Sequence, residues 1–238
     1  MAYWVLKAVL TPILRLLFKV RVEGKGQVPP SGPAILASNH LSFSDSIFLP
    51  MVLRRRITFV AKAEYFEKKK TAWFFRAVGQ IPIKREGGSA SQRALDSAME
   101  VLHGGGLFGI YPEGTRSPDG CLYKGHTGVA RLALKSGAPV LAVAMVGTRE
   151  AQPIGQVKPN FFSPITIRIS KPMQFERYAG RGDDPRVLRQ ITDEVMFDLR
   201  ALSDQEYVDR YAKRGEVVDV TGEATVGSLP TPVAAMTA

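Results

Sequence analysis

The stretch Pro33-Ala-Ile-Leu-Ala-Ser-Asn-His-Leu-Ser-Phe-Ser-Asp45 decides the fold, because a short apolar run passes directly into a polar loop. Gly and Pro residues precede the run, which is typical of a buried strand that follows a turn. His40 therefore follows the end of that strand, where open α/β sheets carry their ligand sites. Ser42 and Ser44 are suitable N-caps for the next helix, which leaves Asp45 in its first turn.

His40 and Asp45 are five residues apart, and on a continuous helix they would be separated by about 140°. They can meet only if His40 lies in the loop or in the first turn. A carboxylate on one ring nitrogen would then fix the tautomer and make the other nitrogen a more useful base. Alternatively, His40 caps a neighbouring element and Asp45 only complements the helix N-terminus. This segment by itself leaves both interpretations open.

Composition limits the possible classes of protein. The 238 residues are enough for one sizeable core, and 45% hydrophobic with 23% charged residues is typical of a globular chain. The single cysteine, Cys121, excludes an intramolecular disulfide and a thiolate zinc cluster. Three histidines lie far apart in sequence, so we expect no metal site. The formal net charge of +10 predicts an anionic partner: a membrane surface, nucleic acid or a phosphorylated substrate.

The N-terminal residues 3–18 are the most hydrophobic stretch, although Lys7, Pro12 and Arg15 interrupt it. The stretch is shorter than the roughly 20 apolar residues that cross a bilayer, and no small-residue cleavage site follows it. We therefore predict that residues 1–22 form an amphipathic membrane-association segment that lies in the interface. A helix packed on its own domain or on a partner is the alternative.

Downstream, short apolar strands alternate with amphipathic helices. The strands are predicted at 57–61, 79–85, 107–111, 139–146 and 165–169, and the helices at 91–103, 126–136 and 185–202. This alternation predicts an α/β fold with a mainly parallel mixed sheet covered by helices. We expect this domain to occupy residues 23–212. Residues 213–238 lack periodicity and are predicted to be a disordered tail.

A second polar loop, Pro112-Glu-Gly-Thr-Arg-Ser117, follows the strand at 107–111 and carries a carboxylate, a guanidinium and two hydroxyls. Because polar loops at strand ends form sites in α/β sheets, this loop and the His40 loop predict one candidate site. A serine hydrolase is not indicated, since no Gly-x-Ser-x-Gly elbow occurs. A nucleotide-phosphate cradle is not indicated either, because His126 occupies the P-loop lysine position.

With both loops identified, the sequence resembles the glycerolipid acyltransferases, in particular the bacterial 1-acyl-glycerol-3-phosphate acyltransferases. Asn39–Asp45 matches the His-x4-Asp block, Gly79–Arg85 matches the Gly-x5-Arg block, and Tyr111–Ser117 matches Phe-Pro-Glu-Gly-Thr-Arg-Ser with Tyr in place of Phe. Lys124-Gly125 and Pro139–Ala142 fall where the last elements of the family belong. The resemblance covers about residues 20 to 175.

This resemblance implies an enzyme that transfers a fatty acyl group from acyl-CoA or acyl-carrier protein to the free hydroxyl of 1-acyl-glycerol 3-phosphate (lysophosphatidic acid). The product is phosphatidic acid. His40 would be the general base, oriented by Asp45, in a direct transfer without an acyl-enzyme. The acyl thioester is a co-substrate, and no other cofactor and no metal are implied. The implied substrate-binding residues are Arg85 and Arg116 for the phosphate, with Lys124 as a weaker candidate, and Glu113, Gly114 and Thr115 around the glycerol backbone and the arginine.

The resemblance also implies phospholipid biosynthesis by a peripheral or monotopic enzyme on an anionic membrane, at the cytoplasmic face of the cell membrane. Pro139–Val146 is expected to supply an apolar wall for the fatty tails. Other acceptors remain open at this point: glycerol 3-phosphate, a lysophospholipid or a glycolipid. A non-catalytic lipid-binding protein would have no need of the combined polar residues, and nucleic acid is not expected as a partner. Arg85 and Arg116 could alternatively pair with Glu86 or Asp119.

Overall fold

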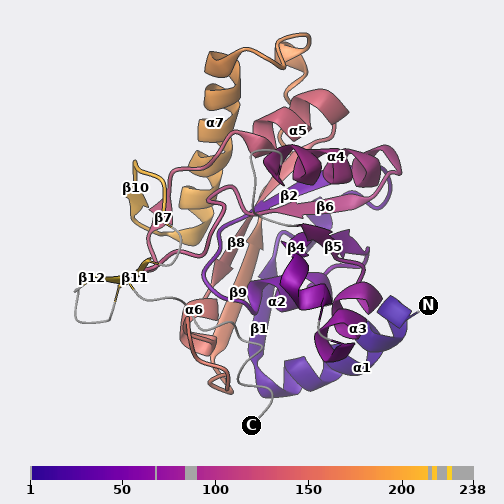
Figure 1. Ribbon diagram of the computed structural model, residues 1–238, viewed down its shortest axis with the longest axis vertical. Helices are drawn as coiled ribbons and strands as arrows, with labels where there is room; N and C mark the ends of the chain where they lie inside the picture. Colours follow the sequence, from indigo (N-terminus) through magenta and orange to yellow (C-terminus); the bar gives the residue numbers. More distant parts are fainter. Residues whose placement is uncertain (1, 68, 84–89, 214–215, 219–223, 227–238) are drawn as a thin grey trace.

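The computed structural model describes residues 2–67, 69–83, 90–213, 216–218 and 224–226 (Figure 1). Its centre is a six-stranded sheet in the order β1-β9-β8-β2-β6-β3. Every neighbouring pair is parallel except β8 and β9, which are antiparallel. The predicted mainly parallel mixed sheet is therefore confirmed. Its strands are β1 (Lys19–Glu23), β2 (Ala34–Ser38), β3 (Ile57–Thr58), β6 (Leu107–Ile110), β8 (Val140–Val146) and β9 (Pro164–Ile169).

Helices cover both faces of this sheet, as Figure 1 shows. Strand β2 is buried throughout and alternates its side chains between the two cores. Ile35 and Ala37 join the core under α4, α5 and α7, whereas Leu36 joins the core under α1 and α2. The helices are α1 (Ala2–Leu17), α2 (Asp45–Val52), α3 (Lys69–Ala77), α4 (Ala90–His103), α5 (Gly128–Ser136), α6 (Thr148–Ala151) and α7 (Pro185–Ser203), with short 3-10 turns η1 (Lys25–Gln27), η2 (Ala63–Phe66) and η3 (Glu176–Tyr178).

The strand predicted at 57–61 is divided between two sheets. β3 ends at Thr58, and Val60 begins β4 (Val60–Lys62), which pairs in parallel with β5 (Ile81–Ile83). The change occurs at Phe59, whose N–H donates to Gln80 Oε1 at 2.8 Å and whose carbonyl accepts from Ile81 N at 3.0 Å. These bonds draw the chain out of the central sheet toward η2 and α3.

The N-terminal residues form a helix, as expected, and α1 packs on α2 and α3. The ammonium of Lys7 donates to the carbonyls of Pro50, at 2.8 Å, and Leu53, so it binds the C-terminal turn of α2. No helix within the described residues is both long enough and apolar enough to span a bilayer. β1 follows α1 directly and pairs with β9. The predicted boundary between residues 22 and 23 therefore falls inside a strand of the sheet.

The C-terminal part of the domain folds around α7. Asp184 Oδ1 accepts from Arg186 N at 2.9 Å, and Pro185 occupies the first helical position. Beyond α7, β10 (Tyr207–Val208) pairs with β7 (Leu122–Tyr123). Most of the predicted tail, residues 213–238, lies outside the described residues. Within it the structure describes residue 213 and an antiparallel pair, β11 (Glu216–Val218) and β12 (Ala224–Val226).

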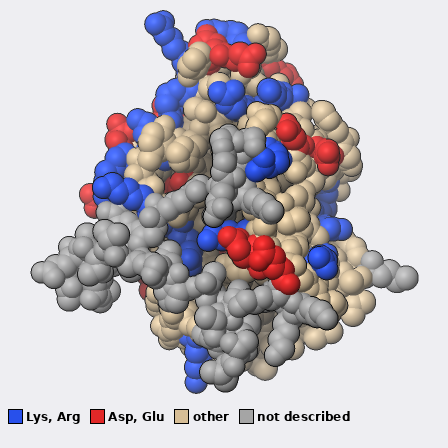
Figure 2. All heavy atoms as spheres, viewed as in Figure 1, with Lys and Arg blue, Asp and Glu red and all other residues tan. Residues whose placement is uncertain are grey.

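The excess of positive charge is distributed over the surface. On the face drawn in Figure 2, the Lys and Arg side chains are interspersed with Asp and Glu. The described part of this face therefore lacks the continuous basic stripe that usually follows a nucleic-acid backbone.

Candidate active site

The loop between β2 and α2 brings His40 and Asp45 together. Nδ1 of His40 lies 2.9 Å from Asp45 Oδ2, and the same oxygen accepts from the backbone N–H groups of Leu41 and Ser42, each at 2.8 Å. Asp45 is fully buried at the first position of α2. The carboxylate therefore fixes both the loop backbone and the orientation of the imidazole.

The expected N-capping by serine side chains is wrong in detail. Ser44 is the N-cap residue of α2, but its side chain makes no capping hydrogen bond. Ser42 Oγ accepts from Ser44 N at 3.2 Å and donates to Gln152 O at 2.8 Å. The Asp45 carboxylate satisfies the loop N–H groups instead, because it can reach backward from the first turn.

The second polar loop, after β6, is joined to His40 through the backbone. Glu113 Oε1 accepts from His40 N at 3.1 Å, and Ser117 N donates to His40 O at 2.8 Å. Both backbone groups of His40 are therefore bound by this loop. The expectation that the two loops meet at one edge of the sheet is confirmed.

The Tyr111 ring lies flat against the imidazole of His40, with 3.8 Å between ring centroids and 12° between planes. The same ring stacks with Phe59 at 5.4 Å between centroids, and its hydroxyl is 2.8 Å from Ser46 Oγ. Burial raises the pKa of Tyr111 well above its usual value, so this hydroxyl stays neutral. Tyr111 thus holds one face of the imidazole.

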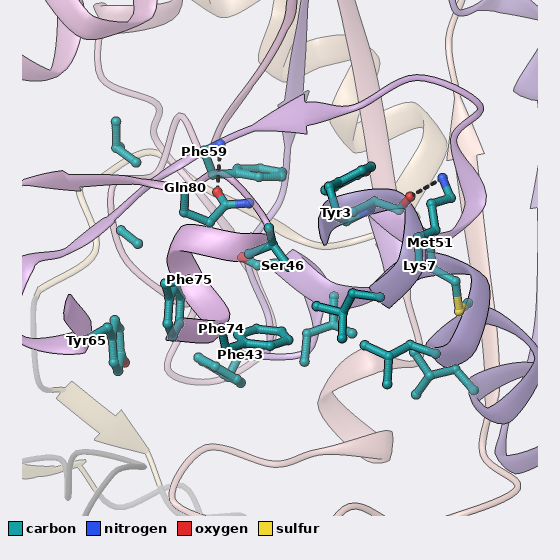
Figure 3. Close-up of a pocket in the computed structure, with 18 of the residues that line it drawn as sticks. Tyr3, Lys7, Phe43, Ser46, Met51, Phe59, Tyr65, Phe74, Phe75 and Gln80 are labelled. Atoms are coloured by element: carbon teal, nitrogen blue, oxygen red, sulfur yellow. Dashed lines mark hydrogen bonds between the residues drawn. The ribbon is translucent and has the colours of Figure 1, made fainter. Parts of the chain in front are cut away.

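A cavity of about 180 Å³ opens beside these two loops, and both His40 and Arg116 line it. Apolar side chains from α1, α2, η2 and α3 form most of the remaining wall. Figure 3 shows aromatic side chains grouped on one side of the cavity and residues of α1 and α2 on the other. The grouped residues are Phe43, Tyr65, Phe74 and Phe75, and those opposite are Tyr3, Lys7 and Met51.

The apolar wall therefore differs from the one expected. Strand β8, within the expected wall Pro139–Val146, lies in the middle of the sheet and is almost completely buried between the two helix layers. Its side chains do not line the cavity. Helix α1 and the aromatic residues of η2 and α3 supply the wall instead, together with residues of α2.

Arg116 is partly buried in this cavity and forms no hydrogen bond or ion pair with the described residues. The expected alternative, a salt bridge to Asp119, is not formed, because Asp119 instead bonds Cys121 N and Tyr123 Oη. Burial lowers the pKa of Arg116, and electrostatic attraction to Tyr65 and Asp45 opposes that effect. A partly buried guanidinium of this kind is suited to bind an anion.

Glu113 has a structural position that the sequence did not indicate. We expected it beside the glycerol backbone, but it is buried and bonds backbone only, with Oε2 accepting from Tyr123 N at 2.9 Å and Oε1 from His40 N. Burial raises its pKa to about 8, against the opposing effect of these two hydrogen bonds. Both oxygens are occupied, so Glu113 connects the His40 loop to β7.

The remaining predicted residues are dispersed. Gly114 adopts a φ of 73° in the turn of the second loop, next to the partly exposed Thr115. Lys124 does not line the cavity and pairs with Asp209 at 2.9 Å. Arg85 lies outside the described residues.

Sequence reasoning missed the support under His40. The Asn39 side chain, fully buried, donates to Met145 O at 3.0 Å and to Gln205 Oε1 at 2.7 Å, and it accepts from Met145 N at 2.7 Å. Gln205 in turn donates to Gly120 O at 2.6 Å. The position of Asn39 next to His40 was the only available signal, because Met145 and Gln205 are distant in sequence.

Comparison with known proteins gives the same family throughout. The chain is 31% identical over 157 residues to the chloroplastic 1-acyl-sn-glycerol-3-phosphate acyltransferase LPAT1 of Arabidopsis thaliana. This match covers 66% of this chain and 44% of the Arabidopsis protein. It is 29% identical to the 1-acyl-sn-glycerol-3-phosphate acyltransferase of Bacillus subtilis, over 57% of this chain and 66% of that one. A lyso-ornithine lipid O-acyltransferase of Pseudomonas aeruginosa is 32% identical over 59% of this chain and 52% of its own length.

The chain spans less than half of the length of the chloroplastic relatives from Arabidopsis thaliana and Brassica napus and of the relative from Chlamydomonas reinhardtii. Among solved structures, the crystal structure of the 1-acyl-sn-glycerophosphate (LPA) acyltransferase PlsC from Thermotoga maritima has the same fold, with a TM-score of 0.60 and 26% identity over 82% of this chain and 76% of that one. The family model described as Acyltransferase matches residues 19–146, more than half of the 238 residues. With the His-x4-Asp loop and the second polar loop inside that range, the chain belongs to the acyltransferase family.

Proposed function

We propose that this protein transfers a fatty acyl group from an acyl thioester to the free hydroxyl of 1-acyl-glycerol 3-phosphate, giving phosphatidic acid. One observation carries the proposal. The carboxylate-bound His40 and the guanidinium of Arg116 line the same cavity, and the other walls of that cavity are mostly apolar. A base, an anion-binding group and an apolar wall are the three features that a single-tailed phospholipid acceptor requires.

In the proposed reaction, the Nδ1–H of His40 donates to Asp45, so Nε2 is the nitrogen that accepts the hydroxyl proton of the acceptor. The oxygen attacks the thioester carbonyl, the C–S bond breaks, and the thiol leaves with the proton. Asp45 stabilises the imidazolium that forms in between. General-base catalysis of this type is typically worth about 10² to 10⁴ in rate.

The phosphate of the acceptor is assigned to Arg116, which lines the same cavity as His40 and whose guanidinium can contact a phosphate through two nitrogens. Arg85 stays a candidate for the same anion by resemblance. Lys124 is a weaker candidate, since its ammonium is paired with Asp209 outside the cavity.

The apolar part of the cavity is assigned to a fatty chain, and α1 is assigned to the bilayer surface. Leu6, Leu10 and Leu14 of α1 line the cavity, while Val5, Val9 and Leu16 are exposed on another side of the helix. A helix that is apolar on both sides can pack on the domain with one and enter the interface with the other. The donor, acyl-CoA or acyl-carrier protein, and the cytoplasmic side of the membrane stay predictions.

The same geometry suits a second acceptor class. One relative is named a lyso-ornithine lipid O-acyltransferase and is about as similar as the others. An acceptor of that type lacks a glycerol phosphate, so the contribution of Arg116 should separate the two possibilities.

The test is incubation of the purified full chain with labelled acyl-CoA or acyl-carrier protein and a panel of acceptors, followed by identification of the product. The panel contains lysophosphatidic acid, glycerol 3-phosphate, lysophospholipids and lyso-ornithine lipid. We expect phosphatidic acid, no turnover by His40→Ala, and at least a ten-fold higher KM for lysophosphatidic acid in Arg116→Ala. Near-normal turnover by His40→Ala would refute the mechanism, and exclusive use of another acceptor would refute the substrate.

A further inference from the structure

The loop between α6 and β9 exposes two adjacent phenylalanines. Phe161 is 41% exposed and Phe162 is 64% exposed. Phe162 also has a φ of 63°, a left-handed conformation that a bulky side chain rarely adopts. Strained backbone of this kind persists only where the surrounding structure imposes it, and it often accompanies a functional role.

The loop is held in place by side-chain and backbone hydrogen bonds. Asn160 N and Nδ2 donate to the carbonyls of Ala151 and Glu150, each at 2.7 Å, and Ser163 Oγ donates to Asn160 O at 2.8 Å. The exposure of the two phenylalanines therefore results from a defined backbone conformation that directs them outward.

The same loop is joined to the C-terminal end of α1. Phe162 N donates to Leu17 O at 2.7 Å, and the Phe161 ring lies 5.9 Å from that of Phe18. Figure 1 shows the end of α1 and the loop after α6 at the same lower edge of the molecule. The exposed apolar residues of α1 form a stripe at helical spacing that ends beside this loop, and they are Val5, Val9, Ile13 and Leu16.

The two segments that form this surface carry only basic charged residues, and Glu23 and Glu150 border them in sequence. Neither residues 1–22 nor residues 151–163 contain Asp or Glu. Arg15, Lys19, Arg21 and Lys158 are exposed within these two segments, and Arg21 pairs with Glu23 at 3.0 Å. Exposed aromatic and aliphatic side chains, in segments whose charged residues are all basic, complement a bilayer that carries anionic headgroups.

We propose that the loop at residues 157–163 is a second membrane-contact site, in which Phe161 and Phe162 enter an anionic lipid interface alongside α1. The proposal extends the bilayer contact assigned to α1 and does not depend on the acyl-transfer chemistry. Two separate contacts would fix the rotation of the protein on the membrane, whereas one helix would leave it free to roll about the helix axis.

The test compares Phe162→Asn with Phe197→Asn in the full chain. Phe197 is the matched control, because it is 70% exposed on α7. Helix α7 covers the face of the sheet opposite to the one that α1 covers. Asn tolerates positive φ better than Phe does, so Phe162→Asn should keep or raise the melting temperature. Sedimentation with vesicles of phosphatidylglycerol and phosphatidylcholine measures binding, and acyl transfer to a monomeric short-chain acceptor measures the catalytic site separately.

We expect Phe162→Asn to weaken vesicle partitioning about ten-fold, as loss of one interfacial phenylalanine implies, and Phe197→Asn to leave it unchanged. Acyl transfer to the monomeric acceptor should be unchanged in both variants. A change of less than two-fold in Phe162→Asn, or equal losses in both variants, would overturn the proposal. If the chain transferred no acyl group at all, the vesicle measurement would still decide this inference.

Discussion

Replacement of Asp45 by Asn tests the proposed mechanism most directly, because it changes a charge with little change of shape. Asp45 Oδ2 accepts from the imidazole and from two backbone N–H groups. An amide oxygen placed at the same point could still accept all three bonds. The loop and the tautomer of His40 should therefore be preserved, and the negative charge beside the imidazolium should be lost.

The size of the effect follows from the short distance between the two groups. Unit charges about 4 Å apart interact by about 4 kcal/mol at an effective dielectric constant of about 20, and the amide dipole retains part of this. We expect kcat to fall by about 10² to 10³, with a smaller change in KM. Asp45 Oδ1 is buried and has no hydrogen-bond partner among the described residues, so the new amide nitrogen would be an unsatisfied donor there. That change should cost about 1–3 kcal/mol of stability.

The assay is steady-state acyl transfer by the purified Asp45→Asn variant, with urea unfolding to measure its stability. Asp209→Asn is the control, because it neutralises an exposed carboxylate that is paired with Lys124 outside the cavity. The control should keep full activity. If folded Asp45→Asn retained kcat within three-fold of the unchanged protein, the carboxylate would have no part in catalysis and the reasoning would be refuted.

Two further predictions concern Glu113 and Tyr111. Burial raises the pKa of Glu113 from its ordinary 4.5 to about 8, so between those pH values the unfolded chain loses a proton that the folded chain keeps, and stability falls as pH rises. The unfolding free energy of Glu113→Gln lacks this dependence on pH. The difference in unfolding free energy between the unchanged protein and the variant, measured by urea unfolding, should therefore shrink from pH 5 to pH 8. A difference that stays constant would contradict the assignment. Tyr111→Phe should keep kcat within about three-fold, because it retains the ring stacked on His40 and loses only the bond to Ser46, whereas Tyr111→Ala should lower kcat about ten-fold. Equal losses in the two Tyr111 variants would show that the hydroxyl, not the ring, supports the imidazole.

Much of this protein follows from local sequence patterns. The apolar run ending at Ala37, the polar loop and the N-terminus of α2 are neighbours in sequence, so their spacing allowed the pairing of His40 with Asp45. The structure decided between that pairing and the alternative in which the two residues do not meet. The second loop follows a strand in the same way. Parallel strands place such loops at one edge of a sheet, and for this reason the contact between the two loops was also predictable.

The tertiary structure decided the features that depend on contacts between distant segments. Apolar residues occur on several sides of α1, so no periodicity could show which side packs on α2 and which stays exposed. Nor could the sequence show that β8 is enclosed by two helix layers, or that the Glu113 carboxylate binds the backbone at His40 and Tyr123. The sequence alone determined the strand-end loops and their reactive residues, because spacing within a short segment sets local geometry. Only the fold decided which surfaces form the cavity, since burial and hydrogen bonding depend on partners brought together from far along the chain.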